Sequence, residues 1–226
     1  MSMDLLMGGA RWALLLSPVV LSFVTPARAA DPYAAPETAV LSYEAGQFER
    51  APTAPVYGPF RVVSESRAEL VDGIDAGTPN QFAAMIAAHP TITRIDMVEC
   101  PGSEDDDANL IVARMIRAAG LAMHVPSGGS IRSGGVELFL AGKIRTADRG
   151  AEIGVHSWQD SEGLEADDYA PSDAVHQPYL AFYQDIGMTQ TQARAFYDFT
   201  NRAASFDDLH VMSDAEVKHY GLLTTP

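Results

Sequence analysis

Strand-like and helix-like stretches alternate from Arg61 onward, and this alternation limits the possible folds more than any other feature of the chain. The pattern predicts strands over residues 67–74, 92–98 and 121–125, with helices over 78–88 and 108–119 between them. Gly120 ends the second helix, as glycine commonly does. Strands that alternate with helices form βαβ units, so we expect an α/β domain whose sheet is at least partly parallel.

The last third of the chain is expected to be helical, with helices over residues 173–185 and 189–203 and a short helix from Ser213 to Gly221. Capping boxes begin the second and third of these helices, at Thr189 and at Ser213. The first two helices carry more aromatic side chains than the edge of a lone domain needs, which favours a homo-oligomer. These residues are Tyr179, Phe182, Tyr183, Phe196, Tyr197 and Phe199.

Residues 1–29 have the pattern of a secretory signal peptide. Arg11 precedes an apolar run that ends at Val24, and Ala27 and Ala29 form a small-x-small cleavage site. The run is too short for a membrane span, so we expect cleavage after Ala29, a periplasmic or secreted protein and no stable membrane insertion afterwards. Residues 30–58 are predicted to be a proline-rich N-terminal extension, and residues 59–226 the folded domain.

The chain is strongly acidic. The predicted signal contains two of the 15 Lys and Arg residues and one of the 30 Asp and Glu residues, so the mature chain has a formal charge of −16. Nucleic acid and anionic lipid surfaces would repel such a chain, which argues against both as partners. Cys100 is the only cysteine, so an internal disulfide is impossible, and we interpret it as a small buried hydrophobe.

Ser133 and His156 are the candidate catalytic residues. Ser133 follows a glycine-rich turn and begins a short apolar helix, where backbone N–H groups can bind an oxyanion. His156 ends an apolar strand, and catalytic groups collect at such ends in layered α/β folds. From residue type alone, the simpler interpretations are that Ser133 is a helix cap and that His156 is a buried, hydrogen-bonded histidine.

No metal site or cofactor is expected. The remaining histidines lack the spacing of zinc ligands; among them are His124, His176, His210 and His219. The acidic run over residues 104–107 lacks the alternating ligands and the turn glycine of a calcium loop. We interpret it as a solvated helix start with Asp107 as the cap.

Four local motifs in this order resemble the Clp-protease/crotonase superfamily, and more narrowly the secreted Clp-like proteins of proteobacteria. They are Ser133 with Gly142 nine residues later, Gly154 before His156, Cys100 with Gly102 in a loop, and the tail from Met212 to Thr224. The resemblance covers residues 61–224 and implies a spiral of βαβ units with a helical C-terminal part. It also implies assembly into a homo-oligomer.

The resemblance implies a serine-type, peptidase-like hydrolase that acts on peptides or proteins. Ser133 would be the nucleophile, His156 the base and Asp208 the residue that orients His156, with Gly102 and Gly134 binding the oxyanion. The chain departs from the family pattern at three places. Ser133 has Arg132 before it and Gly134 and Gly135 after it, where the family usually has small or cysteine residues. Ungapped alignment on Met212 puts Leu209 where the family has its aspartate, and an acidic run follows Gly102.

Two other functions stay open. A Clp-like fold without catalysis could act as a protein-binding module. An acyl-CoA enzyme of the crotonase type is disfavoured, because CoA is absent outside the cytoplasm and an acidic surface repels its phosphates.

Overall fold

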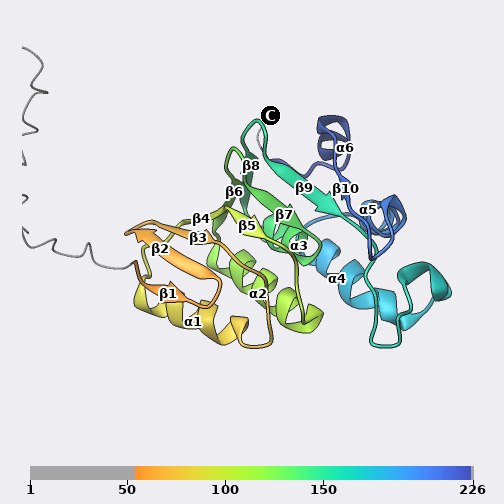
Figure 1. Ribbon diagram of the computed structural model, residues 1–226, viewed down its shortest axis with the longest axis horizontal. Coiled ribbons are helices and arrows are strands. Elements are labelled where there is room, and N and C mark those ends of the chain that lie inside the picture. Colours follow the sequence, from red (N-terminus) through yellow and green to blue (C-terminus); the bar gives the residue numbers. More distant parts are fainter. Residues whose placement is uncertain (1–53, 225–226) are drawn as a thin grey trace, which may run out of the picture. The chain divides into compact units, whose positions relative to one another are not determined.

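The computed structural model describes residues 54–224 (Figure 1). The predicted signal peptide and nearly all of the predicted proline-rich extension lie outside these residues. The first strand, β1 (Val56–Tyr57), pairs with β2, so folded structure begins just before the border predicted at residue 59.

The larger of two sheets has the strand order β1–β2–β3–β4–β6–β8. Its strands after β1 are β2 (Phe60–Ser64), β3 (Arg67–Leu70), β4 (Arg94–Met97), β6 (Ala122–Val125) and β8 (Ile144–Ala147). The first three strands form an antiparallel meander, and β3, β4, β6 and β8 are parallel. The predicted α/β class with a partly parallel sheet is therefore confirmed.

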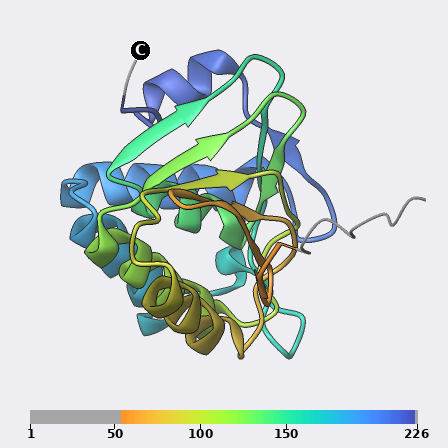
Figure 2. The same ribbon diagram turned by 90° about the vertical axis from the view of Figure 1, so that its left-hand side faces the viewer.

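The smaller sheet has the order β10–β9–β7–β5 and positions the candidate site. Its strands are β5 (Glu99–Cys100), β7 (Ser130–Arg132), β9 (Glu152–Val155) and β10 (His210–Val211). The first three are parallel, and β10 runs antiparallel to β9 (Figure 2). Strands as short as β5, β7 and β10 do not show a period-2 pattern, and none of the three was predicted from the sequence.

Six α-helices in the described part of the chain pack against these strands. They are α1 (Thr78–Ala88), α2 (Asp106–Ala119), α3 (Gly134–Ala141), α4 (Gln177–Asp185), α5 (Gln190–Ala203) and α6 (Asp214–His219). The predicted capping boxes at Thr189 and Ser213 both form, and Gly120 ends α2 with a positive φ of 69°. The cap of α2 is Asp105, which accepts from Ala108, and not Asp107 as the sequence predicted.

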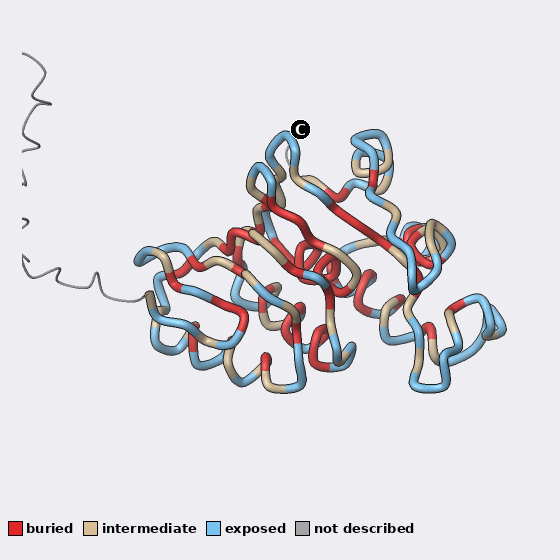
Figure 3. Tube along the Cα trace, in the orientation of Figure 1, coloured by how far each residue is buried: buried red, intermediate tan, exposed pale blue. Residues whose placement is uncertain are grey.

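Helix α3 lies in the centre of the molecule, and all eight of its residues are buried (Figure 3). Apart from Glu137 it contains only apolar residues and glycine, so it can be enclosed on every side without leaving polar side chains unsatisfied. Helix α2 packs along it. The start of α3 is therefore held rigidly from several directions.

The C-terminal aromatic residues do not form the exposed surface that the sequence suggested. Phe182, Tyr183, Phe196 and Tyr197 are each at most 2% exposed, because α4 and α5 pack their aromatic faces into the core of the same chain. The homo-oligomer stays a prediction, but it loses the support of these side chains. Within residues 54–224, no helix combines the length and the apolar composition that crossing a membrane needs.

Candidate active site

The parallel register of the smaller sheet brings three candidate site residues together. Cys100 pairs with Ile131 and Arg132 pairs with Gly154. If this register is continued by one or two residues, Gly102 lies beside Ser133 on one side. The end of β9 lies beside Ser133 on the other side. The Ser133 N–H donates to the Gly154 carbonyl at 3.1 Å, which fixes the turn from β7 into α3 against β9.

Ser133 has the only positive φ of any non-glycine residue in the described part of the chain, with φ 49° and ψ −128°. This conformation is costly for a residue with a Cβ, and such strain persists where the surroundings enforce it. Ser133 is the N-cap of α3, but its side chain accepts no capping hydrogen bond. The simpler interpretation of Ser133 as a hydroxyl cap therefore does not hold.

Two glycines make this turn possible. A Cβ on Gly102, where φ is 133°, would lie 2.9 Å from Ser133 Cβ and 3.4 Å from Ser133 Oγ. A Cβ on Gly134 would lie 2.5 Å from Ser103 Oγ and 2.9 Å from Asn109 Nδ2. Gly102 thus approaches Ser133, and Gly134 approaches Ser103 and Asn109, more closely than a residue with a Cβ would allow.

His156 follows β9 directly and lines the same cavity as Ser133. Its ring packs edge-on against Phe206, with 5.5 Å between the ring centroids. The Nδ1 atom is buried and has no hydrogen-bond partner among the described residues. No described group therefore fixes the tautomer of His156.

The structure does not bring Asp208 to His156. Asp208 is exposed, and its carboxylate accepts from Ser205 Oγ at 3.4 Å. Leu209, the next residue, faces Gly154, since its Cδ1 lies 2.8 Å from the position of a Cβ there. Of the predicted site residues, Ser133, His156 and Gly134 line one cavity and Gly102 borders Ser133, whereas Asp208 lies apart.

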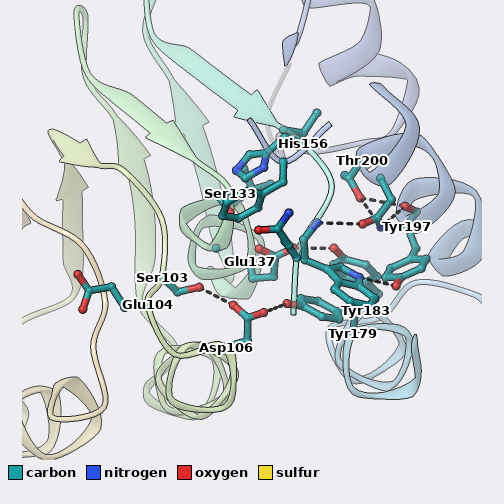
Figure 4. Close-up of a pocket in the computed structure, with 17 residues that line it drawn as sticks. Ser103, Glu104, Asp106, Ser133, Glu137, His156, Tyr179, Tyr183, Tyr197 and Thr200 are labelled. Atoms are coloured by element: carbon teal, nitrogen blue, oxygen red, sulfur yellow. Dashed lines mark hydrogen bonds between the residues drawn. The ribbon is translucent and has the colours of Figure 1, made fainter. Parts of the chain in front are cut away.

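The cavity above Ser133 has a volume of about 430 Å³ (Figure 4). Aromatic side chains form much of its wall: Trp158, Tyr179, Tyr183, Tyr197 and Phe206. Trp158 Nε1 donates to Tyr197 Oη at 2.7 Å, and His176 Nδ1 lies 2.8 Å from the same oxygen. His176 is thus a buried structural histidine, bonded to Tyr197 and to the Ala170 carbonyl.

Two carboxyl groups line this cavity close to tyrosine hydroxyls. Glu137 is 6% exposed and accepts from Tyr183 Oη at 2.6 Å, and its burial raises its pKa to about 7. Asp106 accepts from Ser103 Oγ at 2.7 Å and from Tyr179 Oη. Burial together with these carboxyl groups raises the pKa of Tyr179 and of Tyr183, so both phenols stay protonated as donors.

Sequence reasoning missed both of these acids. In the acidic run over residues 104–107, Glu104, Asp106 and Asp107 are exposed, as the sequence predicts, but Asp106 also faces the cavity. Glu137 gave a signal that could have been used, because it is the single charged residue in an otherwise apolar helix. Four residues after Ser133, it lies near the same face of that helix.

The described residues contain no group of three or more His, Cys, Asp or Glu side chains arranged to hold a metal ion. Cys100 is fully buried, and its burial raises its pKa to about 12, which confirms its interpretation as a buried hydrophobe and not a nucleophile.

No protein-family model and no curated protein matches this chain. Among solved structures, it is similar to a mutant of the 1510-N membrane-bound stomatin-specific protease, at 18% identity and a TM-score of 0.46, over 70% of this chain and 76% of that one. It is also similar to ClpP1 from Listeria monocytogenes, at 15% identity and a TM-score of 0.47, over 70% and 89% of the two chains.

A third similar structure is the ClpP protease catalytic domain from Plasmodium falciparum, at 15% identity and a TM-score of 0.47, over 69% of this chain and 81% of that one. Because these identities and TM-scores are low, the chemistry proposed for this chain rests on the geometry of its own site.

Proposed function

We propose that this protein is a serine-type hydrolase that cleaves peptides, with Ser133 as the nucleophile and His156 as the general base. The observation that carries this proposal is the strained backbone of Ser133 beside Gly102 in a cavity that His156 also lines. Strain of this kind is typical of functional positions, because a purely structural serine would relax or be glycine.

The reaction would run through an acyl-enzyme. Ser133 Oγ attacks the peptide carbonyl carbon while a ring nitrogen of His156 takes the hydroxyl proton, and the N–H groups of Gly102 and Gly134 donate to the oxyanion. The C–N bond then breaks, and His156 gives its proton to the leaving amine. Water, deprotonated by His156, attacks the Ser133 ester; the bond from the acyl carbon to Ser133 Oγ then breaks, His156 returns the proton to Oγ, and the carboxylic acid is released.

The backbone geometry supports the oxyanion role of the two glycines. In the described part of the chain, neither the Gly102 N–H nor the Gly134 N–H donates to another residue. The Gly134 N–H lies in the first turn of α3, at the positive end of the helix dipole. Ser133 and His156 share no hydrogen bond, but such bonds often form only when substrate is present.

A non-catalytic, protein-binding role is the second candidate, because no described carboxylate orients His156. A fluorophosphonate probe decides between the two, since it reacts only with an activated serine. We expect labelling of wild type, loss of labelling in Ser133→Ala and His156→Ala, and full labelling in Ser127→Ala. Ser127 is an exposed serine in the loop after β6 and so serves as the matched control.

Folded wild type that the probe leaves unlabelled would exclude the hydrolase and favour the binding role. Labelling that persists in Ser133→Ala would assign the activity to another serine. Circular dichroism on each variant separates loss of chemistry from loss of fold.

A further inference from the structure

The cavity above Ser133 has an acidic wall without a counter-charge. Glu104, Asp106 and Glu137 line it, and none of the described lining residues is Lys or Arg. The nearby Arg132 is not a lining residue, because its guanidinium pairs with Glu99 on the neighbouring strand. The only group in the wall that can become cationic is His156, which the proposed chemistry already uses.

Glu137 is the central group of this wall. Its carboxyl is buried within the apolar helix α3, yet it reaches the cavity between α3 and α4 (Figure 4). A carboxylate offers about four acceptor positions, and among residues 54–224 Tyr183 is the only side chain that donates to Glu137. No Lys or Arg side chain lines the cavity to neutralise this carboxylate, and burying a charged group is costly unless an opposite charge pairs with it.

The rest of the wall suits a cation with an apolar stem. Asp106 and the tyrosines 179, 183 and 197 present carboxylate oxygen, phenol oxygen and aromatic rings to the same space. Aromatic rings attract ammonium and guanidinium groups through their negatively charged faces. They also pack against the methylene stems of lysine and arginine.

We propose that this cavity selects peptides in which the carbonyl attacked by Ser133 belongs to a lysine or arginine residue, whose side chain pairs with Glu137 and Asp106. This inference rests on the proposed function. The reach fits, because Glu137 lies four residues after Ser133 along α3, about 6 Å at the rise of an α-helix. The four-carbon stem of lysine spans roughly that distance from its backbone.

The charge of Glu137 gives the proposal a pH signature. With a pKa of about 7, Glu137 is neutral in mild acid and ionised in mild base, so the preference for a cation should increase as the pH rises through 7. The titratable groups that line the cavity with it are Glu104 before α2, Asp106 on α2, Tyr179 and Tyr183 on α4, Tyr197 on α5 and His156 after β9. The ratio of the rates for a cationic and a neutral substrate cancels every effect that the two substrates share.

The experiment measures kcat/KM for two peptide substrates that differ only in having lysine or norleucine before the cleaved bond. Norleucine keeps the four-carbon stem and lacks the ammonium group. We expect wild type to favour lysine about tenfold or more at pH 8, as for a hydrogen-bonded charge pair, and less at pH 6. Glu137→Gln should lower the lysine-to-norleucine ratio about tenfold, and Asp106→Asn should lower it less.

Glu65→Gln is the matched control, because Glu65 is exposed and does not line the cavity. Its ratio should equal that of wild type. If Glu137→Gln does not fold, the wild-type ratio and Asp106→Asn still decide the question. If the probe labels Ser133 but kcat/KM is equal for the two peptides, or higher for norleucine, the proposed selectivity is wrong. The proposed hydrolase then still stands. No labelling and no cleavage of either peptide overturns the hydrolase itself.

Discussion

The serine half and the histidine half of the candidate site are held in place to different degrees. Ser133 is fixed by a hydrogen bond to Gly154, by the close approach of Gly102 and by the fully buried helix α3. His156 is held by the end of β9 and an edge-on contact with Phe206, a side chain that is 42% exposed. The fold thus enforces a strained nucleophile but leaves its base without an orienting partner. Changes in the serine half should therefore have the larger effects.

Gly102→Ala should have the largest effect on activity. The new methyl group would lie 2.9 Å from Ser133 Cβ, and the φ of 133° is unfavourable for alanine. Displacing this N–H from an oxyanion typically costs at least about 100-fold, so we expect fluorophosphonate labelling to slow by that factor. The control is Gly128→Ala, which also has a positive φ but open space around the new Cβ. It should lose stability and keep its labelling rate; equal slowing in both variants would show that strain, and not the contact with Ser133, is responsible.

Glu137→Gln tests how the buried carboxyl group in the same cavity as Ser133 affects the pH dependence of folding stability. Because burial raises the pKa of Glu137 from 4.5 to about 7, the folded state holds its proton where the unfolded state has lost it. Stability that Glu137 contributes is complete below pH 4.5, falls as the pH rises to 7 and is constant above, a total loss of about 3 kcal/mol.

The variant should therefore match wild type near pH 4 and exceed it by up to about 3 kcal/mol at pH 8, measured by urea unfolding. Tyr183 can still donate to the amide oxygen of glutamine, which preserves the packing. A difference between the two proteins that does not change with pH would mean that Glu137 does not titrate in this window.

Ser133→Gly tests the backbone strain directly. Glycine accepts a positive φ at no steric cost, so it relieves roughly 1–3 kcal/mol of strain but adds up to about 1 kcal/mol of unfolded-state entropy. We expect Ser133→Gly to be about 1 kcal/mol more stable than Ser133→Ala in chemical denaturation. Glycine and alanine at the exposed position Ser127 provide the reference pair, and there the order should reverse.

The sequence was sufficient for those parts of the site that depend on local pattern. Ser133 at a helix start and His156 at a strand end were found because glycine-rich turns and apolar runs mark such positions. The partners that come from distant segments were not found. Asp106 and Phe206 reach the cavity through the packing of α2 and of the segment after α5, which no local pattern encodes. The strand β5, which carries the chain toward Gly102, was too short to recognise.

Asp208→Asn should have the smallest effect, and it decides whether the histidine half has an orienting acid. The sequence resemblance assigns this role to Asp208, which predicts labelling that slows by orders of magnitude, as when an orienting aspartate is lost from a catalytic triad. The structure has its carboxylate exposed and bonded to Ser205, so we expect less than about a threefold change, similar to the neighbouring control Asp207→Asn. A large loss in Asp208→Asn alone would mean that residues 205–209 rearrange when substrate binds and bring the carboxylate to Nδ1 of His156. The two halves of the site would then be equally organised in the working enzyme, and the difference between them would belong to the free protein only.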